Sequence, residues 1–296
     1  MTTLENTDGA TGGHPGGLTL VAGGTGRTGR RVAERLRARG VAVRAGSRRG
    51  EPPFDWHDPA TWEAALEGAT GVYLAYAPDL GTAEATRVVA DFAGAAARAG
   101  VRHVVLLSMR GRDDSRPTGV QARAAERAVR ECGTTWTVLR AAWFFQNFSE
   151  LDAFRASLRA GEFALPVGDG REAFVDTEDI AEVAVAALLD PAPHAGRCYE
   201  LSGGRLLSFW DAVAEIASAT GREIRAVRPA PAEFAGALHE AGLPASEVEL
   251  LGELLDRVSV GEMAYVSDGV REVLGRAPRD FGDFVKSSAA AGVWLD

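Results

Sequence analysis

The chain has 296 residues, of which 46% are hydrophobic and 25% are charged, and its formal net charge is −9. This length and balance are those of a folded protein with a large core, so a chain that is disordered throughout is excluded. The excess of acidic residues argues against a general nucleic-acid binder, which would need a basic face.

The first 17 residues are polar and glycine-rich and lack the basic start and apolar core of a signal peptide. We therefore expect residues 1–17 to form a flexible tail. No apolar run approaches the ~20 residues needed to span a bilayer, so no membrane contact is expected. The two cysteines, Cys132 and Cys198, fit neither a disulfide framework nor a metal site, which is typical of a cytoplasmic protein.

Short apolar runs alternate with longer helical patterns from Leu18 onward. The strands are predicted at Leu18–Ala22, Val41–Ala45, Gly71–Ala77, Val101–Ser108 and Thr135–Leu139. The helices are predicted at Arg27–Arg39, Thr82–Ala99 and Gly119–Cys132. This alternation indicates βαβ units, and near-continuous apolar strands are typical of a parallel sheet covered on both faces. The sequence therefore predicts an α/β fold with a doubly wound, parallel, Rossmann-type sheet.

The pattern is less regular after Arg140. A helix is predicted over Thr177–Leu189, with Asp176 as its cap, and Arg197–Leu201 is expected to be another strand. Ser208–Asp211 has the form of a capping box that opens a further helix.

Several helices rich in Glu and Ala are expected from about residue 229 onward. We therefore divide the chain after the tail into a dinucleotide-binding domain over 18–150 and a smaller, mostly helical substrate lobe over 151–296. Residues near 172–203 are expected to return to the sheet.

The first strand leads directly into a glycine-rich turn and a helix. Glycines at 23, 26 and 29 suit a tight turn whose backbone approaches a pyrophosphate at the N-terminus of the helix. Its place between a strand and a helix makes the motif informative. The predicted dinucleotide contacts are Gly23, Thr25, Gly26, Arg27, Thr28 and Gly29. The alternative is a strand-to-helix turn without a ligand.

The end of the second strand distinguishes NADP from NAD. Arg48 and Arg49 stand where an NAD site usually has Asp or Glu. A guanidinium pairs with a 2′-phosphate, whereas an acid would repel it, so NADP(H) is the predicted cofactor. Arg27 is expected to add to the same charge. The alternative is that Arg48 and Arg49 are solvated loop residues.

Two neighbouring segments have open interpretations. Asp55 and Trp56 either contact adenine, by a hydrogen bond and by packing, or serve as a turn residue and a core aromatic. The stretch from Arg27 to Arg49 contains Glu34 as its one acid, so most of its arginines are expected on a solvated face. Examples are Arg31, Arg35 and Arg39.

The glycine-rich turn is one of several segments that together are typical of one family. The set comprises Val21–Gly29, Val43–Arg48, Val101–Ser108, Trp136–Arg140, Trp143–Phe148, Asp179–Ala181 and Tyr199–Gly203. It resembles the NmrA-like family of atypical short-chain dehydrogenases/reductases over roughly residues 18–220. The resemblance implies a Rossmann-type domain that binds NADP(H) and a lobe that supplies the substrate pocket. Members include reductases of quinones, dyes and phenolic compounds, and regulators that bind the dinucleotide without turnover.

The resemblance also implies roles for individual positions. Arg48 matches the arginine that contacts the 2′-phosphate, and the segment from Arg140 to Asn147 runs along the pocket. The residues assigned to the nicotinamide side are Ala75, Tyr76, Ala77, Ser108 and Met109.

The chain departs from its wider class in catalysis. Typical short-chain reductases use Tyr-x-x-x-Lys, in which the lysine lowers the pKa of the tyrosine. Lys286 is the only lysine, and the segment Gly119–Glu126 contains no tyrosine, lysine or histidine. The remaining catalytic candidates are Tyr76, Ser108 and Asn147, with water or the substrate as other proton sources. Their alternatives are a strand-end aromatic, a backbone-bonded hydroxyl and a helix cap.

Aromatic side chains follow the fifth strand. Trp143, Phe144, Phe145 and Phe148 are candidates to line an apolar pocket for a flat ring, the alternative being core packing. The histidines are not spaced as metal ligands, so no metal is expected.

The sequence therefore predicts an NADPH-dependent oxidoreductase for a small, apolar, aromatic or quinonoid acceptor. A composition rich in Ala, Arg and Gly adds a hint of natural-product metabolism in a GC-rich bacterium. Two alternatives are a non-catalytic NADP(H) sensor that docks on a regulatory partner and a redox-neutral isomerase, epimerase or cyclase that retains NADP. The expected partner is a small-molecule substrate, and the sequence does not decide whether the chain forms a homo-oligomer.

Overall fold

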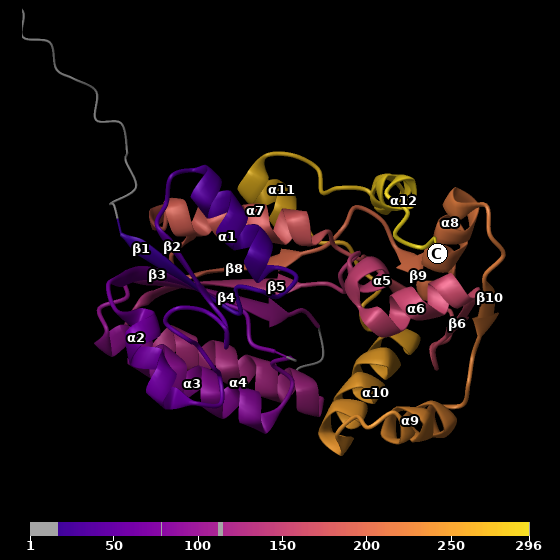
Figure 1. The fold of residues 1–296 in the computed structure, drawn as a ribbon, viewed down its shortest axis with the longest axis horizontal. Coiled ribbons are helices and arrows are strands. Elements are labelled where there is room, and N and C mark those ends of the chain that lie inside the picture. The colour runs from indigo at the N-terminus through magenta and orange to yellow at the C-terminus, as the bar shows by residue number, and fades with distance from the viewer. Residues whose placement is uncertain (1–16, 78, 112–114, 296) are drawn as a thin grey trace, which may run out of the picture.

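The chain folds around a six-stranded sheet in which every pair of neighbouring strands is parallel, in the order β2-β1-β3-β4-β5-β8 (Figure 1). The structure, a computed structural model, describes residues 17–77, 79–111 and 115–295, so the predicted tail lies almost entirely outside the described residues. The strands are β1 (Leu18–Ala22), β2 (Val43–Gly46), β3 (Ala69–Leu74), β4 (His103–Met109), β5 (Thr135–Ala141) and β8 (Arg197–Leu201). The predicted doubly wound parallel sheet is confirmed.

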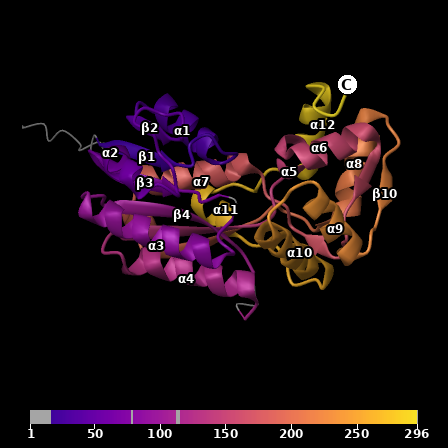
Figure 2. The ribbon, with the colours of Figure 1, turned by 60° about the horizontal axis from the view of Figure 1, so that its bottom comes forward.

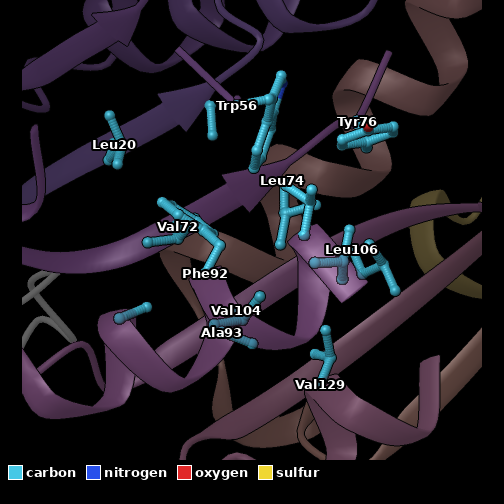
Figure 3. Close-up of a cluster of buried hydrophobic side chains, with 14 of the residues drawn as sticks. Leu20, Trp56, Val72, Leu74, Tyr76, Phe92, Ala93, Val104, Leu106 and Val129 are labelled. Atoms are coloured by element: carbon cyan, nitrogen blue, oxygen red, sulfur yellow. The ribbon is translucent and has the colours of Figure 1, made fainter. Parts of the chain in front are cut away.

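Helices cover both faces of the sheet (Figure 1). One face carries α1 (Gly29–Ala38), α7 (Thr177–Leu189) and α11 (Gly269–Leu274), and the other carries α2 (Trp62–Leu66), α3 (Ala83–Arg98) and α4 (Pro117–Glu131). Successive strand residues point to opposite faces, so Leu20 joins the core under α3 and α4, whereas Val21 joins the core under α1 and α7. Figure 3 shows the first of these cores, with Phe92 of α3 and Val129 of α4 facing the strands.

The chain returns to the sheet after the first five strands. Helix α7 has the bounds that the sequence predicts, and the side chain of Asp176 accepts a hydrogen bond from the N–H of Glu178 at 2.9 Å, as a cap does. Strand β8 then pairs with β5, which confirms the predicted strand Arg197–Leu201. The short 3₁₀ helices η1 (Pro59–Thr61) and η2 (Ala192–His194) precede α2 and β8.

A smaller lobe lies beyond the carboxyl ends of the strands (Figures 1 and 2). Its helices are α5 (Asn147–Glu150), α6 (Asp152–Ala160), α8 (Phe209–Thr220), α9 (Pro231–Glu240), α10 (Ala245–Ser259) and α12 (Phe281–Ala290). Two small sheets pair β6 (Glu162–Ala164) with β10 (Arg225–Val227) and β7 (Arg171–Glu172) with β9 (Leu207–Ser208). The predicted capping box is confirmed, with Ser208 and Asp211 bonded reciprocally at 3.0 and 2.9 Å. Strands of two or three residues carry no periodic signal, so the sequence did not predict these sheets.

Arginines of α1 bind glutamates of α5, in the lobe, and of α7, on the sheet. The side chain of Arg31 is 12% exposed and contacts Glu150 of α5 at 2.7 Å and Glu178 of α7 at 2.6 Å. Arg35 also pairs with Glu178. The prediction of solvated side chains is therefore wrong for Arg31 and Arg35, because their partners lie more than a hundred positions away, and it is confirmed for the exposed Arg39.

Burial of His103 predicts a pH-dependent stability. Its ring nitrogens lie 2.8 Å from Thr135 Oγ1 and 3.1 Å from Thr137 Oγ1, and burial, with the nearby His194, lowers the pKa of His103 to about 4. The unfolded chain titrates near 6.5 and so takes up the proton first as the pH falls. Between pH 7 and pH 5 this single group should lower the free energy of unfolding by about 2 kcal/mol.

Urea unfolding at pH 7 and pH 5 tests this expectation. The variant His103→Gln keeps hydrogen-bonding groups but does not titrate, so it should lose about 2 kcal/mol less than the wild type over this interval. Equal losses in the two proteins would show that His103 is not the titrating group.

Candidate functional site

The glycine-rich turn lies where the strand order reverses. Strand β1 sits between β2 and β3, and in open α/β sheets ligands bind outside the carboxyl ends of the strands at such a point. Gly23 has φ +86°, and a Cβ there would lie 2.5 Å from the carbonyl oxygen of Ala75. A Cβ on Gly29 would overlap the carbonyl oxygen of Gly23. Only glycine fits these two positions, so the backbone can turn tightly into α1.

Helix α1 completes an anion site. No acidic residue lies in its first turn, so the N–H groups of that turn and the positive end of the helix dipole are not neutralised locally. This arrangement fits a pyrophosphate.

A cavity of about 730 Å³ runs from this turn along the carboxyl ends of the strands to the lobe. It is lined by most of the residues that the sequence analysis selected, namely Gly23, Thr25, Gly26, Arg27, Thr28, Arg48, Asp55, Trp56, Ala75, Tyr76, Ala77, Ser108, Met109, Trp143, Phe144 and Asn147. Gly29, Arg49, Phe145 and Phe148 are not part of this lining.

Arg48 is an exposed cation at the β2 end of the cavity. Within the described part of the chain no carboxylate forms an ion pair with it, and the neighbouring Ser47 also lines the cavity. An unpaired guanidinium beside a hydroxyl fits a phosphate group. The adjacent Arg49 is exposed but lies outside the cavity lining, so the two arginines are not equivalent.

Asp55 and Trp56 have mainly structural contacts. The carboxylate of Asp55 accepts a hydrogen bond from the N–H of His57 at 3.0 Å, as in a turn. The ring of Trp56 lies 4.7 Å from that of Phe54 and 5.1 Å from that of Phe92, and Figure 3 shows it within this core. These contacts fit the turn and core interpretation, but both residues also line the cavity, so the contact with adenine stays a prediction.

Arg27 and Asn147 bind each other across the cavity. The guanidinium of Arg27 donates to Asn147 Oδ1 and lies 5.6 Å from the ring centroid of Phe144. Burial lowers the pKa of Arg27. Asn147 and Phe144, the two partners of Arg27, follow β5 in the chain, whereas Arg48 follows β2 at the sheet edge. This placement does not support the expectation that Arg27 adds to the charge around a 2′-phosphate.

Ser108 is bound to a buried carboxylate. Its hydroxyl donates to Glu126 of α4 at 2.8 Å, and the side chain of Glu126 is 1% exposed. Arg140 binds the same carboxylate at 2.7 and 3.0 Å, and Arg123 and Arg130 also contact it. Although burial raises the pKa of Glu126, these hydrogen bonds and charges hold it below its usual value. The Ser108 proton is therefore directed to a carboxylate and away from the cavity.

Tyr76 has no activating lysine. Burial raises its pKa and the charge of Glu84 adds to this effect, whereas an activated tyrosine has a lowered pKa. The ring lies 5.4 Å from that of Trp56 and belongs to the core (Figure 3). Lys286 pairs with Asp283 on α12, in the lobe.

The aromatic segment after β5 divides between cavity and core. Trp143 and Phe144 line the cavity, but Phe145 and Phe148 are 2% and 0% exposed. Their rings pack in the lobe core, Phe145 at 5.0 Å from Phe281 and Phe148 at 5.4 Å from Phe174. The pocket prediction is wrong for Phe145 and Phe148, because the chain turns into α5 here and points them into the lobe.

Helix α10 supplies a cavity wall that the sequence analysis did not assign. Leu250, Leu251 and Leu254 line the cavity from α10, and Leu243 lines it from the connection between α9 and α10. The sequence shows the apolar periodicity of these leucines, but such a periodicity does not distinguish a helix face that packs in a core from one that lines a pocket. Asp79, which follows β3, was also missed.

Two kinds of feature were not found in the described residues. No group of three or more His, Cys, Asp or Glu side chains is arranged to hold a metal ion there. In the same residues, no helix is long and apolar enough to cross a membrane.

Fold and site together define a dinucleotide-binding protein of the Rossmann type. Residues 23–191 match the family described as NAD(P)H-binding. The chain is 32% identical to the NAD(P)H azoreductase of Xenophilus azovorans, covering 93% of this chain and 99% of that protein. It is 31% identical to the agroclavine dehydrogenase of Claviceps fusiformis, covering 93% and 98%.

A similar solved structure is the triphenylmethane reductase of Citrobacter sp. complexed with NADP(H), at 21% identity and a TM-score of 0.71, covering 92% of this chain and 99% of that one. The chain belongs to the NAD(P)H-binding family. Its fold is also similar to that of a solved NmrA structure, at 19% identity and a TM-score of 0.66, covering 93% of this chain and 96% of that one.

Proposed function

We propose that this chain is an NADPH-dependent oxidoreductase that reduces a small, apolar, aromatic or quinonoid acceptor. The observation that carries the proposal is the continuity of one cavity from the glycine-rich turn and Arg48 to an apolar wall of the lobe. A bound NADPH supplies a hydride, and the protein supplies binding and orientation. Bringing the acceptor beside the hydride donor in such a cavity is itself a large part of catalysis.

The residues present fit this cofactor. The N–H groups around Gly23–Gly29 and the N-terminus of α1 would hold the pyrophosphate, and Arg48 with Ser47 would hold the 2′-phosphate. Ser108 keeps its oxygen lone pairs for a donor at the nicotinamide end, because its proton goes to Glu126. Ala75, Ala77 and Met109 would border the same end, in keeping with the sequence prediction.

The apolar wall indicates the acceptor class. Trp143, Phe144 and the leucines of α10 offer flat and aliphatic surfaces that suit a fused or conjugated ring. The names of the azoreductase, the triphenylmethane reductase and the agroclavine dehydrogenase point to flat aromatic or alkaloid substrates of those proteins. We extend this class, including natural products, to the present chain.

Catalysis without a Tyr-x-x-x-Lys pair is part of the proposal. In α4, Ala122 and Glu126 have the four-residue spacing of such a pair but are neither tyrosine nor lysine. The Glu126 carboxylate is bound to Ser108 and to three arginines. We further propose a cytoplasmic protein whose partner is its small-molecule substrate, with neither nucleic acid nor membrane involved.

The test is consumption of NADPH with a panel of quinones, azo dyes, cationic triphenylmethane dyes and enones. We expect turnover with flat aromatic acceptors. In Leu254→Asp the apolar wall carries a charge, so KM for the acceptor should rise at least about tenfold while the Kd of NADPH is unchanged. Binding of NADPH without any consumption would favour a sensor, and product formed without net loss of NADPH would favour an isomerase.

A further inference from the structure

Asp79 lies where the dinucleotide-binding domain meets the lobe. It lies two residues after the segment Ala75–Ala77, which follows β3 and borders the cavity, and it lines the cavity itself. Gly81, two residues further along the chain, packs tightly, because a Cβ on it would lie 2.7 Å from Leu250 Cδ1 of α10 and 3.1 Å from Thr118 of α4. Asp79 therefore stands beside the apolar wall and at the β3 side of the site, away from Arg48 at the β2 edge.

The carboxyl group of Asp79 is held by its own turn. One oxygen, Oδ1, accepts a hydrogen bond from the N–H of Gly81 at 3.1 Å. Among the described residues no arginine or lysine forms an ion pair with it, although Arg257 of α10 is near enough to act on it through its charge. A carboxyl fixed in this way presents its second oxygen without a salt-bridge partner.

Burial raises the pKa of Asp79, and the N–H groups of Gly81 and Leu80 and the charge of Arg257 offset only part of this effect. The group thus keeps its proton to higher pH than an ordinary aspartic acid, and a general acid works best when its pKa approaches the working pH.

The hydroxyls and the arginines of the cavity are less suited to this task. The Ser108 proton is bound to Glu126, and burial raises the already high pKa of Tyr76. Arginines such as Arg27 and Arg48 donate hydrogen bonds but do not release protons.

We propose, on the basis of the proposed function, that Asp79 is the general acid that protonates neutral acceptors. Hydride addition gives a neutral quinone or enone two electrons and leaves a negative charge on its oxygen. The O–H bond of Asp79 breaks as its proton passes to that oxygen and forms a new O–H bond there. The resulting Asp79 carboxylate then takes a proton from water.

This role separates two classes of acceptor. A cationic triphenylmethane dye becomes neutral on accepting a hydride and needs no proton, whereas a neutral quinone needs one. Loss of the Asp79 proton should therefore slow the reduction of neutral quinones alone and leave that of the cationic dye unchanged.

The test uses Asp79→Asn with a neutral 1,4-naphthoquinone and a cationic triphenylmethane dye as acceptors. Asparagine keeps an oxygen for the Gly81 N–H, so the turn is preserved. We expect kcat/KM for the naphthoquinone to fall about 100-fold and that for the dye to change less than about twofold. Asp58→Asn is the matched control, since Asp58 makes the same kind of turn contact with Ala60 and lies outside the cavity lining; both activities should stay at wild-type level.

Equal losses of kcat/KM with the two acceptors would show that Asp79 has a structural role only. Unchanged naphthoquinone reduction in Asp79→Asn would also overturn the proposal. A wild type that reduces the dye but no neutral acceptor would overturn the role of Asp79 while leaving the proposed function intact. A wild type that binds NADPH and reduces neither acceptor would overturn both.

Discussion

Arg48→Ala is expected to raise the Kd of NADPH by about 10- to 100-fold and that of NADH by less than about threefold. Arg48 borders the cavity at the end of β2 as an exposed cation, so a 2′-phosphate would provide its counter-charge. NADH lacks that phosphate and loses little when the guanidinium is removed. Fluorescence titration of both cofactors against both proteins gives the four constants.

Arg49→Ala is the matched comparison, because Arg49 is the adjacent exposed arginine but does not line the cavity. We expect it to raise the Kd of NADPH by less than about threefold. Equal weakening of NADPH and NADH in Arg48→Ala would remove the 2′-phosphate assignment, and a larger effect at Arg49 would transfer it to that residue.

Glu126→Ala is expected to lower the free energy of unfolding by about 3 kcal/mol. Its buried carboxylate is shared by Arg140, Arg123 and Ser108, so the alanine variant leaves cations and a hydroxyl without their acceptor. The fall should appear as a lower urea midpoint with an unchanged m value.

Glu131→Ala provides the control for helix propensity, since Glu131 is an exposed residue of the same helix. It should change the free energy of unfolding by no more than about 0.5 kcal/mol. Similar losses in the two variants would mean that the ion cluster around Glu126 contributes no more than an exposed glutamate.

Much of the dinucleotide-binding domain could be predicted, because its signals are local. A parallel strand buried on both faces is apolar at nearly every position, so β1 and β4 stand out as short apolar runs. The start of α7 followed from the cap at Asp176. The glycine-rich turn was readable because close backbone approach permits no side chain at Gly23 or Gly29.

Part of the site could not be predicted, because it depends on which face of a segment is turned inward. Phe144 lines the cavity while the next residue, Phe145, packs in the lobe core, although both are aromatic. Likewise, the leucines of α10 have the same periodicity whether they face a core or a pocket.

By itself the sequence determined the class of the fold, the glycine-rich turn and the presence of a single lysine, Lys286. Only the tertiary structure decided the partners of the charged groups. Arg31 binds glutamates of α5 and α7, Arg27 binds Asn147, and Glu126 holds the proton of Ser108. The physical reason is that backbone geometry and apolar periodicity act between near neighbours in sequence, whereas an ion pair or a cavity wall is made by segments that meet only when the chain has folded.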